Sequence, residues 1–428
     1  MRRRQVLAAG ALALSAGIAG CNESAPPPDA TFDRPDDRWP SPGYDPGNTG
    51  HAPAAPGPGE ERWRTGRRAT DPPLFGTLST PIVGEHVYVA GLADRFFDPE
   101  DNSLALAALD RASGEPVWTV GFDGGLSGEP VLLDSTLVAG GYDGRLHGLS
   151  TGGERRWSLG LDGPSGTPAP YGDRVYVADG DGSIHAVTAD GERLWRVRRE
   201  FLLERLAEGV LGEDEPVAVG TPAADERGVY ATVGSFDEAG ETVVVLAYDH
   251  RGNRRWRRAV EDVGDRVVHG PAVADGTVYA VVGDTVVALD AADGSEQWRF
   301  VTGYATPGPP ATDGERCYVG AKNLYALDTT TGEERWRVVN EAVRTSSEWT
   351  RGVPYVARPA VAGGAVHLRA GAFDAATGER VWGDDADTWV TESDYFDDAF
   401  GYRPSVRPVV TAEACYLTHA IEGVMRLG

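Results

Sequence analysis

The chain has 428 residues and a formal net charge of −25, because 65 Asp and Glu residues outnumber 40 Lys and Arg residues. This negative excess opposes contact with a phosphate backbone, so we expect no nucleic-acid partner. Lys322 is the single lysine among the 40 basic residues. Since repulsion between acidic groups is screened at high ionic strength, the composition favours a halophilic and archaeal source.

The first 20 residues have the features of an export signal rather than of folded structure. Arg3 and Arg4 are typical of a twin-arginine signal, and the apolar stretch 8–20 is too short to span a bilayer comfortably. The four residues ending at Cys21 resemble a lipobox. We therefore expect residues 1–20 to be removed and Cys21 to carry a lipid, which anchors the protein to the outer side of the cytoplasmic membrane. An uncleaved signal anchor or simple secretion are the alternatives.

Residues 22–58 contain ten prolines and little apolar content. Segments of this composition bury too little surface to fold by themselves. We expect residues 21–58 to form a Pro-rich, disordered tether between the lipid and the folded domain.

From residue 59 onward the chain repeats the pattern of a glycine, three residues and a tryptophan. The pattern occurs eight times, and most Trp-to-Trp intervals are 38 to 46 residues, with two longer intervals of 55 and 61. A period of about 40 residues with four apolar runs per unit is typical of a β-propeller. The eight tryptophans that we expect to dock between blades are Trp63, Trp118, Trp157, Trp195, Trp256, Trp298, Trp336 and Trp382.

Each unit begins with a proline and ends with the tryptophan strand, but the two signals are out of phase. The first tryptophan ending, at residues 59–63, precedes the first opening proline, Pro81, and the last opening proline, Pro408, has no tryptophan after it. We therefore expect residues 59–65 to supply the outer strand of the last blade and so close the ring. The predicted fold is all-β: a single eight-bladed β-propeller of four-stranded antiparallel blades over residues 59–428.

The repeat also identifies a family. Residues 326–336, Ala-Leu-Asp-Thr-Thr-Thr-Gly-Glu-Glu-Arg-Trp, are similar to the tryptophan-docking motif of quinoprotein-type repeats, and residues 39–50 are similar to the lead-in segment of the same proteins. The chain resembles the pyrroloquinoline-quinone-like propeller family, including its BamB-like lipoproteins, over roughly residues 59–428. The resemblance implies the fold but not one function, because the family contains both quinone-dependent dehydrogenases and cofactor-free binding proteins.

Five long insertions should lie on one face of the propeller, at 91–102, 197–220, 234–241, 338–357 and 383–404. Loops on a rigid scaffold often carry binding function, so this face is the predicted partner face, although insertions can also accumulate there harmlessly. The candidate anchors are aromatic residues of the last insertion: Trp389, Tyr395, Phe396 and Phe400. Asp394, Asp397 and Asp398 are weak candidates for a Ca²⁺ site, but their spacing matches no EF-hand loop and a solvated acidic loop explains them better.

The residues immediately before the opening prolines should line the upper channel. They are Thr80, Glu129, Thr167, Thr221, Gly270, Pro309, Arg358 and Arg407. Arg358 and Arg407 come from adjacent blades, and two guanidinium groups could hold a carboxylate or a phosphate. A salt bridge to nearby acidic residues is the alternative.

No residues with the spacing of a catalytic or metal site are evident. The dehydrogenases of the family are expected to carry adjacent cysteines, whereas Cys317 and Cys415 fall on blades that are not neighbours and should be buried apolar fillers. We expect a monomeric, non-enzymatic scaffold that needs no cofactor and binds an extracytoplasmic protein. A solute or polysaccharide receptor, and a quinone-dependent dehydrogenase with Ca²⁺, are the alternatives.

Overall fold

The computed structural model describes most of the repeat region and part of the segment before it. The described residues are 27–28, 37–53, 60–66, 69–70, 74–75, 79–93, 104–122, 124–198, 217–237, 240–260, 268–303, 308–339, 358–368, 371–382, 408–419 and 423–428. Arg3, Arg4 and Cys21 of the expected signal and anchor lie outside these residues. The described residues contain no helix that is long and apolar enough to cross a membrane.

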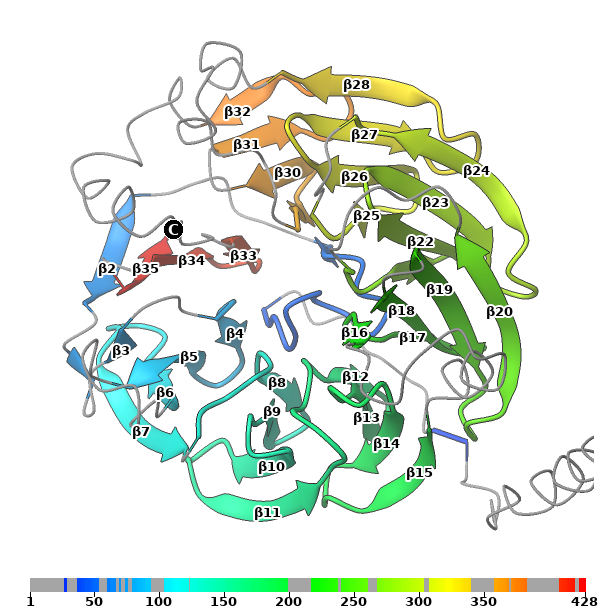
Figure 1. Cartoon of the computed structure of the whole chain (residues 1–428). Coiled ribbons are helices and arrows are strands. Elements are labelled where there is room, and N and C mark those ends of the chain that lie inside the picture. Colours follow the sequence, from blue (N-terminus) through cyan, green and yellow to red (C-terminus); the bar gives the residue numbers. More distant parts are fainter. Residues whose placement is uncertain are drawn as a thin grey trace, which may run out of the picture.

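Eight sheets form the blades of a propeller, which confirms the predicted fold (Figure 1). The four strands of each blade pair antiparallel, and β1 (His51–Ala52) adds a parallel strand to the inner edge of the seventh sheet, beside β29 (Ala360–Ala362). Blade 1 contains β3 (Leu74–Phe75), β4 (Ile82–Val83), β5 (Val87–Ala93), β6 (Leu104–Leu109) and β7 (Pro116–Phe122), and blade 2 contains β8 (Val131–Leu133), β9 (Thr136–Gly140), β10 (Arg145–Ser150) and β11 (Arg155–Gly160). Blade 3 contains β12 (Ala169–Tyr171), β13 (Arg174–Ala178), β14 (Ile184–Thr188) and β15 (Arg193–Val197). Blade 4 contains β16 (Val217–Val219), β17 (Ala223–Asp225), β18 (Gly228–Asp237), β19 (Gly240–Tyr248) and β20 (Arg254–Val260).

Blades 5 to 8 complete the ring. Blade 5 contains β21 (Ala272–Ala274), β22 (Thr277–Val282), β23 (Thr285–Asp290) and β24 (Glu296–Val301), and blade 6 contains β25 (Ala311–Thr312), β26 (Arg316–Gly320), β27 (Leu324–Asp328) and β28 (Glu334–Val338). Blade 7 contains β1 (His51–Ala52), β29 (Ala360–Ala362), β30 (Ala365–Leu368), β31 (Gly371–Asp374) and β32 (Arg380–Trp382). Blade 8 contains β33 (Pro408–Val410), β34 (Cys415–His419), β35 (Gly423–Leu427) and β2 (Glu61–Thr65). The innermost strand of each blade faces the channel, and the tryptophan strand is outermost.

The two faces of the propeller differ in their connections. We call the turn face the side that carries the turns between first and second strands and between third and fourth strands. We call the mouth face the side that carries the second-to-third turns and the crossings to the next blade. Four of the five predicted insertions fall wholly or largely outside the described residues. The fifth, 234–241, lies at the tip of the β18–β19 hairpin, whose pairing continues to Asp237↔Gly240, so most of this insertion lengthens the strands and little of it is a free loop.

Residues near the N-terminus close the ring as predicted. β2 pairs antiparallel with β35 in the register Thr65↔Val424, so it is the outer strand of blade 8. The Trp63 and Tyr416 rings lie 6.2 Å apart between their centroids. The corresponding Tyr–Trp pairs of blades 1, 3, 4, 5 and 6 are 5.7–5.9 Å apart. The N-terminal strand therefore makes the same contacts as its counterparts in other blades.

Each docked tryptophan joins its blade to the next one by a hydrogen bond. The indole N–H groups of seven tryptophans donate to backbone carbonyls at 2.7–3.0 Å: Trp63 to Arg111, Trp118 to Thr151, Trp157 to Ala189, Trp195 to His250, Trp256 to Ala291, Trp298 to Thr329 and Trp336 to Ala375. The bond satisfies the polar end of a ring whose remainder is packed between blades. The side chain of Trp382 is outside the described residues.

In the seven repeats whose glycine the structure describes, Gly114 to Gly378, the glycine is required by this docking as well as by its turn. Gly332 has φ +72°, and a Cβ atom there would lie 2.6 Å from the Trp298 ring of the preceding blade. Gly114 has φ +74° and would place a Cβ atom 2.5 Å from the Trp63 ring. The left-handed backbone and the close approach both exclude a side chain. The glycine and tryptophan of one repeat therefore contact different neighbours, and the repeat links three successive blades.

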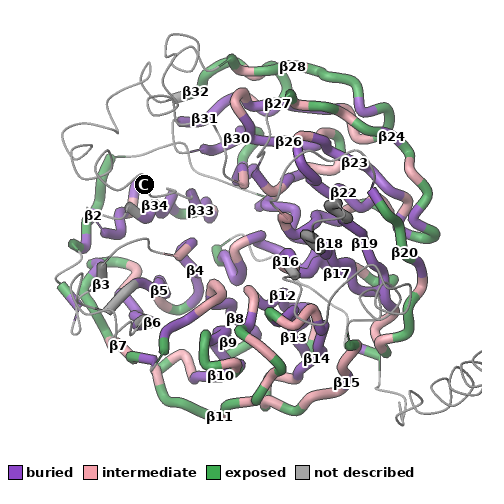
Figure 2. Tube along the Cα trace, viewed as in Figure 1, coloured by how far each residue is buried: buried purple, intermediate pink, exposed green. Residues whose placement is uncertain are grey.

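Residues 37–53 are not a tether, in contrast to our expectation for residues 21–58. They pass through the centre of the propeller, where Figure 1 shows them in blue, and most are buried (Figure 2). Trp39 is 1 % exposed and Tyr44 is fully buried. We call residues 37–53 the belt. The physical reason is that the inner edge of each blade needs backbone partners, and the backbone of the belt supplies them.

Successive residues of the belt contact successive blades, from blade 1 to blade 7. Backbone carbonyls of the belt accept hydrogen bonds of 2.7–2.9 Å from the N–H groups of the second residue after the opening proline in six blades: Trp39 from Val83, Pro40 from Leu132, Pro46 from Ala224, Gly47 from Val273, Thr49 from Thr312 and Gly50 from Val361. In blade 3 the corresponding residue is Pro170, which has no N–H group to donate. The belt crosses that blade without needing to supply an acceptor.

Candidate functional site

A cavity of about 350 Å³ lies in the channel on the mouth side of the belt. Trp39 and Pro42 of the belt contribute to its lining. Six of the eight residues that we expected at the channel mouth also line it: Thr80, Thr167, Thr221, Gly270, Pro309 and Arg358. Because the belt bonds to residues deeper in the inner strands, it occupies the turn-face end of the channel, and the cavity lies at the mouth-face end.

Glu129, the seventh expected channel residue, joins neighbouring blades at the rim of this cavity. Its carboxylate accepts hydrogen bonds from the Thr80 N–H at 2.7 Å and the Thr80 hydroxyl at 2.8 Å. Its own N–H donates to the Thr167 hydroxyl oxygen at 3.0 Å. Thr80, Glu129 and Thr167 thus connect blades 1, 2 and 3. Glu129 has a structural role in this chain of bonds, which sequence spacing alone did not indicate.

Arg358 lies against the belt. A Cβ atom on Gly43 would be 2.5 Å from a terminal guanidinium nitrogen of Arg358 and 2.4 Å from the Asn48 Oδ1 atom. Only glycine at position 43 leaves room for this arrangement. Arg407, the eighth expected channel residue and the predicted partner of Arg358 in an anion site, lies outside the described residues. The described part of the cavity therefore brings one guanidinium group to the channel.

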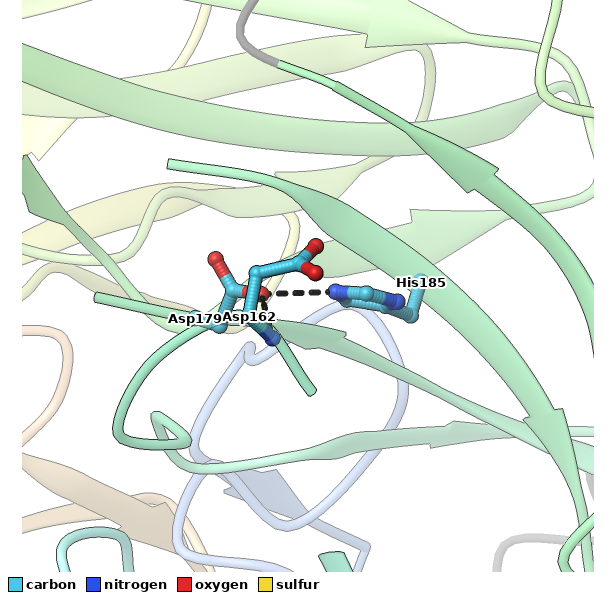
Figure 3. A group of neighbouring side chains, drawn as sticks. All are labelled: Asp162, Asp179 and His185. Atoms are coloured by element: carbon cyan, nitrogen blue, oxygen red, sulfur yellow. Dashed lines mark hydrogen bonds and ion pairs between the residues drawn. The ribbon is translucent and has the colours of Figure 1, made fainter. Parts of the chain in front are cut away.

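A second group of ionisable side chains lies between blades 2 and 3 on the mouth face. Asp162, Asp179 and His185 place their ligand atoms within 4.8 Å of one another (Figure 3). Asp179 and His185 have no exposed side-chain surface. The His185 Nε2 atom is 2.8 Å from the Asp179 Oδ2 atom. The cluster is not evident from the sequence, because Asp179 comes from a turn, His185 from β14 and Asp162 from the neighbouring blade.

The donors around Asp179 argue for a structural clasp and against a metal site. Besides His185, its carboxylate accepts bonds from the N–H groups of Asp162 at 3.2 Å, Asp181 at 3.1 Å and Ser183 at 2.9 Å. Despite its burial, these hydrogen bonds hold the pKa of Asp179 below its usual value. The carboxylate is thus an ionised acceptor to which His185 Nε2 donates.

The two outer members of the cluster support the same conclusion. Asp162 is already paired with Arg196. The His185 Nδ1 atom has no hydrogen-bond partner among the described residues, whereas a metal-binding histidine normally donates its second N–H to a neighbouring acceptor. Asp162, Asp179 and His185 therefore join blade 2 to blade 3 and do not form a good metal site.

The expected partner residues Trp389, Tyr395, Phe396 and Phe400, and the acidic residues Asp394, Asp397 and Asp398, lie outside the described residues. Cys317 and Cys415 are buried free thiols on β26 and β34. Burial raises the pKa of the Cys317 thiol well above its ordinary value and that of Cys415 to about 12. Neither thiol is suited to nucleophilic chemistry near neutral pH.

The eight-bladed ring with docked tryptophans defines the class of protein as a pyrroloquinoline-quinone-like β-propeller. A family model described as "Outer membrane protein assembly factor BamB" matches residues 100–233 and 213–426, and the chain belongs to this family. A comparison with curated protein sequences finds no match.

Solved structures with the same fold include proteins of different kinds. BamB from Moraxella catarrhalis is 16 % identical with a TM-score of 0.54, covering 83 % of this chain and 99 % of its own. Quinohemoprotein alcohol dehydrogenase from Comamonas testosteroni is 15 % identical with a TM-score of 0.63, covering 91 % and 80 % respectively. The computationally designed Ika8 protein is 15 % identical with a TM-score of 0.59, covering 86 % and 99 %. At such low identity these similarities show the fold alone.

Proposed function

We propose that this protein is a lipid-anchored, extracytoplasmic scaffold that binds a protein partner through the mouth face of its propeller. Family membership supports the scaffold, and the signal-like N-terminus with Cys21 supports the anchor. The acidic, lysine-poor composition supports a halophilic source. In such an organism the protein would lie on the cell surface. Catalysis is not part of the proposal.

The observation that carries the proposal is the place where the chain enters the propeller. The Arg111 guanidinium donates to the Asp37 carbonyl at 3.0 Å and to the Gly84 carbonyl at 3.0 Å, and it pairs with Glu413 at 3.2 Å. Gly84, Arg111 and Glu413 belong to turns of blades 1 and 8 on the turn face. The belt therefore begins at the turn face.

This entry point determines how an anchored propeller is oriented. Fifteen residues separate Cys21 from Asp37, and a chain of that length spans at most about 50 Å when extended and about 20 Å on average. A lipid on Cys21 would keep the turn face toward the membrane. The mouth face, with its cavity and insertions, would then point away and be accessible to a partner.

Fluorescence quenching tests the anchor and the orientation together. Asp190→Cys on the turn face and Tyr142→Cys on the mouth face each add one exposed thiol, because Cys317 and Cys415 are buried. With the lipidated protein in vesicles that contain nitroxide lipids, we expect stronger quenching of a label at position 190 than at 142. Equal or reversed quenching would contradict the orientation. Release of a Cys21→Ser variant from membranes tests the lipid, and its full retention with correct processing would exclude it.

The partner face has its own test, which uses residues outside the described part. Replacing both Trp389 and Tyr395 by alanine should weaken capture of the partner from detergent-solubilised membranes, with about 2 kcal/mol for each true anchor. The melting temperature should stay unchanged. If capture is unaffected by this pair but lost on substitution of turn-face residues, the wrong face has been assigned.

The cavity favours a solute receptor as the second candidate function. Its volume of about 350 Å³ lies in the range typical of small-molecule sites, roughly 300–1,000 Å³. Arg358 would hold a carboxylate or phosphate group, alone or together with Arg407. A rise in melting temperature with a small organic acid, lost in Arg358→Gln, would support the receptor.

The residues of the cavity do not fit a quinone held with calcium, which the dehydrogenase alternative requires. Calcium needs several oxygen ligands, usually carboxylates among them. No Asp or Glu is among the described residues that line the cavity, and the nearby Glu129 carboxylate is engaged by Thr80. We therefore propose no quinone-dependent reaction for this chain. Alcohol-dependent dye reduction at about 1 s⁻¹ or faster, with quinone and Ca²⁺ added, would overturn this conclusion.

A further inference from the structure

Arg111 lies where the ring closes and where the belt begins. Its guanidinium group donates to the carbonyls of Gly84 in blade 1 and Asp37 in the belt, both at 3.0 Å. The same group pairs with the Glu413 carboxylate of blade 8 at 3.2 Å. Its backbone carbonyl accepts the indole N–H of Trp63 on β2 at 3.0 Å. One residue therefore connects blade 1, the belt, blade 8 and the strand that closes the ring.

The arginine is specific to this closure and is not a feature of the repeat. In the seven described repeats the residue at this position accepts the indole N–H of a docked tryptophan through its backbone carbonyl, so the docking does not depend on the side chain. The other six residues at this position are Thr151, Ala189, His250, Ala291, Thr329 and Ala375. None of these side chains offers the several donors with which Arg111 joins three elements.

Blade 8 is joined to the ring less completely than the other blades. The chain connects β33–β35 to blade 7, whereas β2 precedes blade 1 in the chain, so the ring is closed by the β2–β35 pairing. The belt does not reinforce this closure: Val410 is the second residue after the opening proline, and no belt carbonyl among the described residues accepts its N–H. Six other blades have such a bond. Blade 3 lacks one, but the chain joins it to both of its neighbours.

Side-chain hydrogen bonds between blades are also fewer at this closure. In blades 3, 4 and 6 a tyrosine hydroxyl bonds to the next blade: Tyr176 to the His250 ring at 2.7 Å, Tyr230 to Ala291 O at 3.4 Å and Tyr318 to Ala375 O at 3.2 Å. Tyr416 of blade 8 is fully buried, and neither its hydroxyl nor that of Thr418 has a hydrogen-bond partner among the described residues. Buried polar groups without partners are destabilising. The Arg111–Glu413 pair therefore carries much of the polar contact between blade 1 and β33–β35.

We propose that blade 8 is a gate in the ring and that Arg111 is its latch. The gate opens by local unfolding, in which β33–β35 separate from blade 1 and from β2. The first residues of the belt are released in the same event, because Arg111 holds them as well as blade 8. Pro408 of β33 lines the cavity, so opening gives access to the cavity from the side and uncovers the edge of β35. The inference goes beyond the proposed function and does not depend on the lipid or on a partner.

Hydrogen exchange of the full-length protein, followed by mass spectrometry at about 0.1 M salt, tests the gate, since ion pairs are only partly screened under this condition. The strand β22 of blade 5 is the matched control for β34 of blade 8, because both strands are paired on both sides. After correction for intrinsic rates, we expect the amides of β34 to exchange at least about tenfold faster than those of β22 in the wild type.

Substitutions at the latch test its coupling to the belt. Arg111→Ala should raise exchange about tenfold or more in β33–β35 and at the Trp39 amide of the belt, with blade 5 unchanged, because bonds to charged groups are among the stronger ones. Arg111→Lys keeps the charge without the forked geometry and should give an intermediate rate.

A second substitution approaches the latch from blade 8. Glu413 is 59 % exposed and, among the described residues, reaches the belt only through Arg111. Glu413→Ala should therefore leave the fold intact and still raise exchange at Trp39 about threefold or more. The matched control is Arg227→Ala, because Arg227 pairs with Asp225 and Glu226 of its own turn. This control should change exchange in blade 8 and the belt less than about twofold.

Four results would overturn the proposal. Equal exchange of β34 and β22 in the wild type would show that blade 8 does not open first. An equal rise in all blades of Arg111→Ala would mean that the residue only stabilises the whole fold, and a rise confined to β2 and β35 would mean that the terminal strands fray without opening a gate. Unchanged exchange at Trp39 in Glu413→Ala would disprove the coupling of blade 8 to the belt. None of these outcomes involves the lipid or a partner, so the tests of the proposed function stay valid.

Discussion

Asn48 of the belt offers a sharp test of whether the belt holds the propeller together. Its side chain is 2 % exposed, and its Nδ2 group donates to Pro222 O at 2.7 Å and to Pro271 O at 3.3 Å. These carbonyls belong to the opening prolines of blades 4 and 5. Asn48 also has φ +54°, a conformation that asparagine tolerates better than most residues.

The cost of Asn48→Ala follows from these contacts. Loss of the shorter bond removes about 1 kcal/mol, and a buried carbonyl left without a donor costs about 1–3 kcal/mol more. A left-handed alanine adds roughly 1 kcal/mol of strain. The expected destabilisation is about 4 kcal/mol, which for a cooperative unit of this size lowers the melting temperature by about 5 °C.

Asn253→Ala is the matched control. Asn253 also donates its side-chain amide, to Asp249 at 2.9 Å, but in an exposed turn, so its loss should cost at most about 1 kcal/mol. Guanidinium unfolding followed by tryptophan fluorescence measures both variants. Equal stability of the two variants would show that the buried contacts of Asn48 do not stabilise the propeller, and it would refute the structural role of the belt.

Three further predictions address the ring and its pH dependence. Gly332→Ala should cost clearly more stability than Gly303→Ala in chemical unfolding: both glycines have positive φ, but only at position 332 does a Cβ atom meet the Trp298 ring, so equal losses would refute the docking role. His367 should make the protein acid-sensitive, because burial lowers its pKa from 6.5 to about 4; the unfolded state then binds more protons between these values, and about 3 kcal/mol of stability is lost as pH falls from 6.5 to 4. His367→Tyr should flatten that part of the pH–stability profile, and an unchanged slope would disprove the assignment. Deletion of residues 59–65 should expose the edge of β35 and lower the melting temperature sharply; a variant that melts like the full chain would exclude closure by β2.

The architecture could be predicted from the sequence because its determinants are local and repeated. The interval from glycine to tryptophan fixes a turn and an outer strand eight times over, and the phase difference between Pro81 and Trp63 is enough to predict closure by residues 59–65. The residues before the opening prolines were predicted at the channel for the same reason. A strand position that recurs in every blade must recur at the same depth, and Thr80, Thr167 and Arg358 line the cavity accordingly.

Other features depend on contacts between residues that are distant in sequence. The composition of residues 22–58, with ten prolines and little apolar content, indicates disorder for the belt that lies within it. Its order comes from six inner strands, each of which donates a backbone N–H group to a carbonyl of the belt. Likewise, Asp162 and His185 are unremarkable along the chain until the ring brings blade 2 against blade 3. The repeat thus determined the blades, whereas tertiary structure decided how the channel is filled and how Asp162, Asp179 and His185 join blades 2 and 3. The physical reason is that buried backbone and charged groups need partners wherever the fold places them.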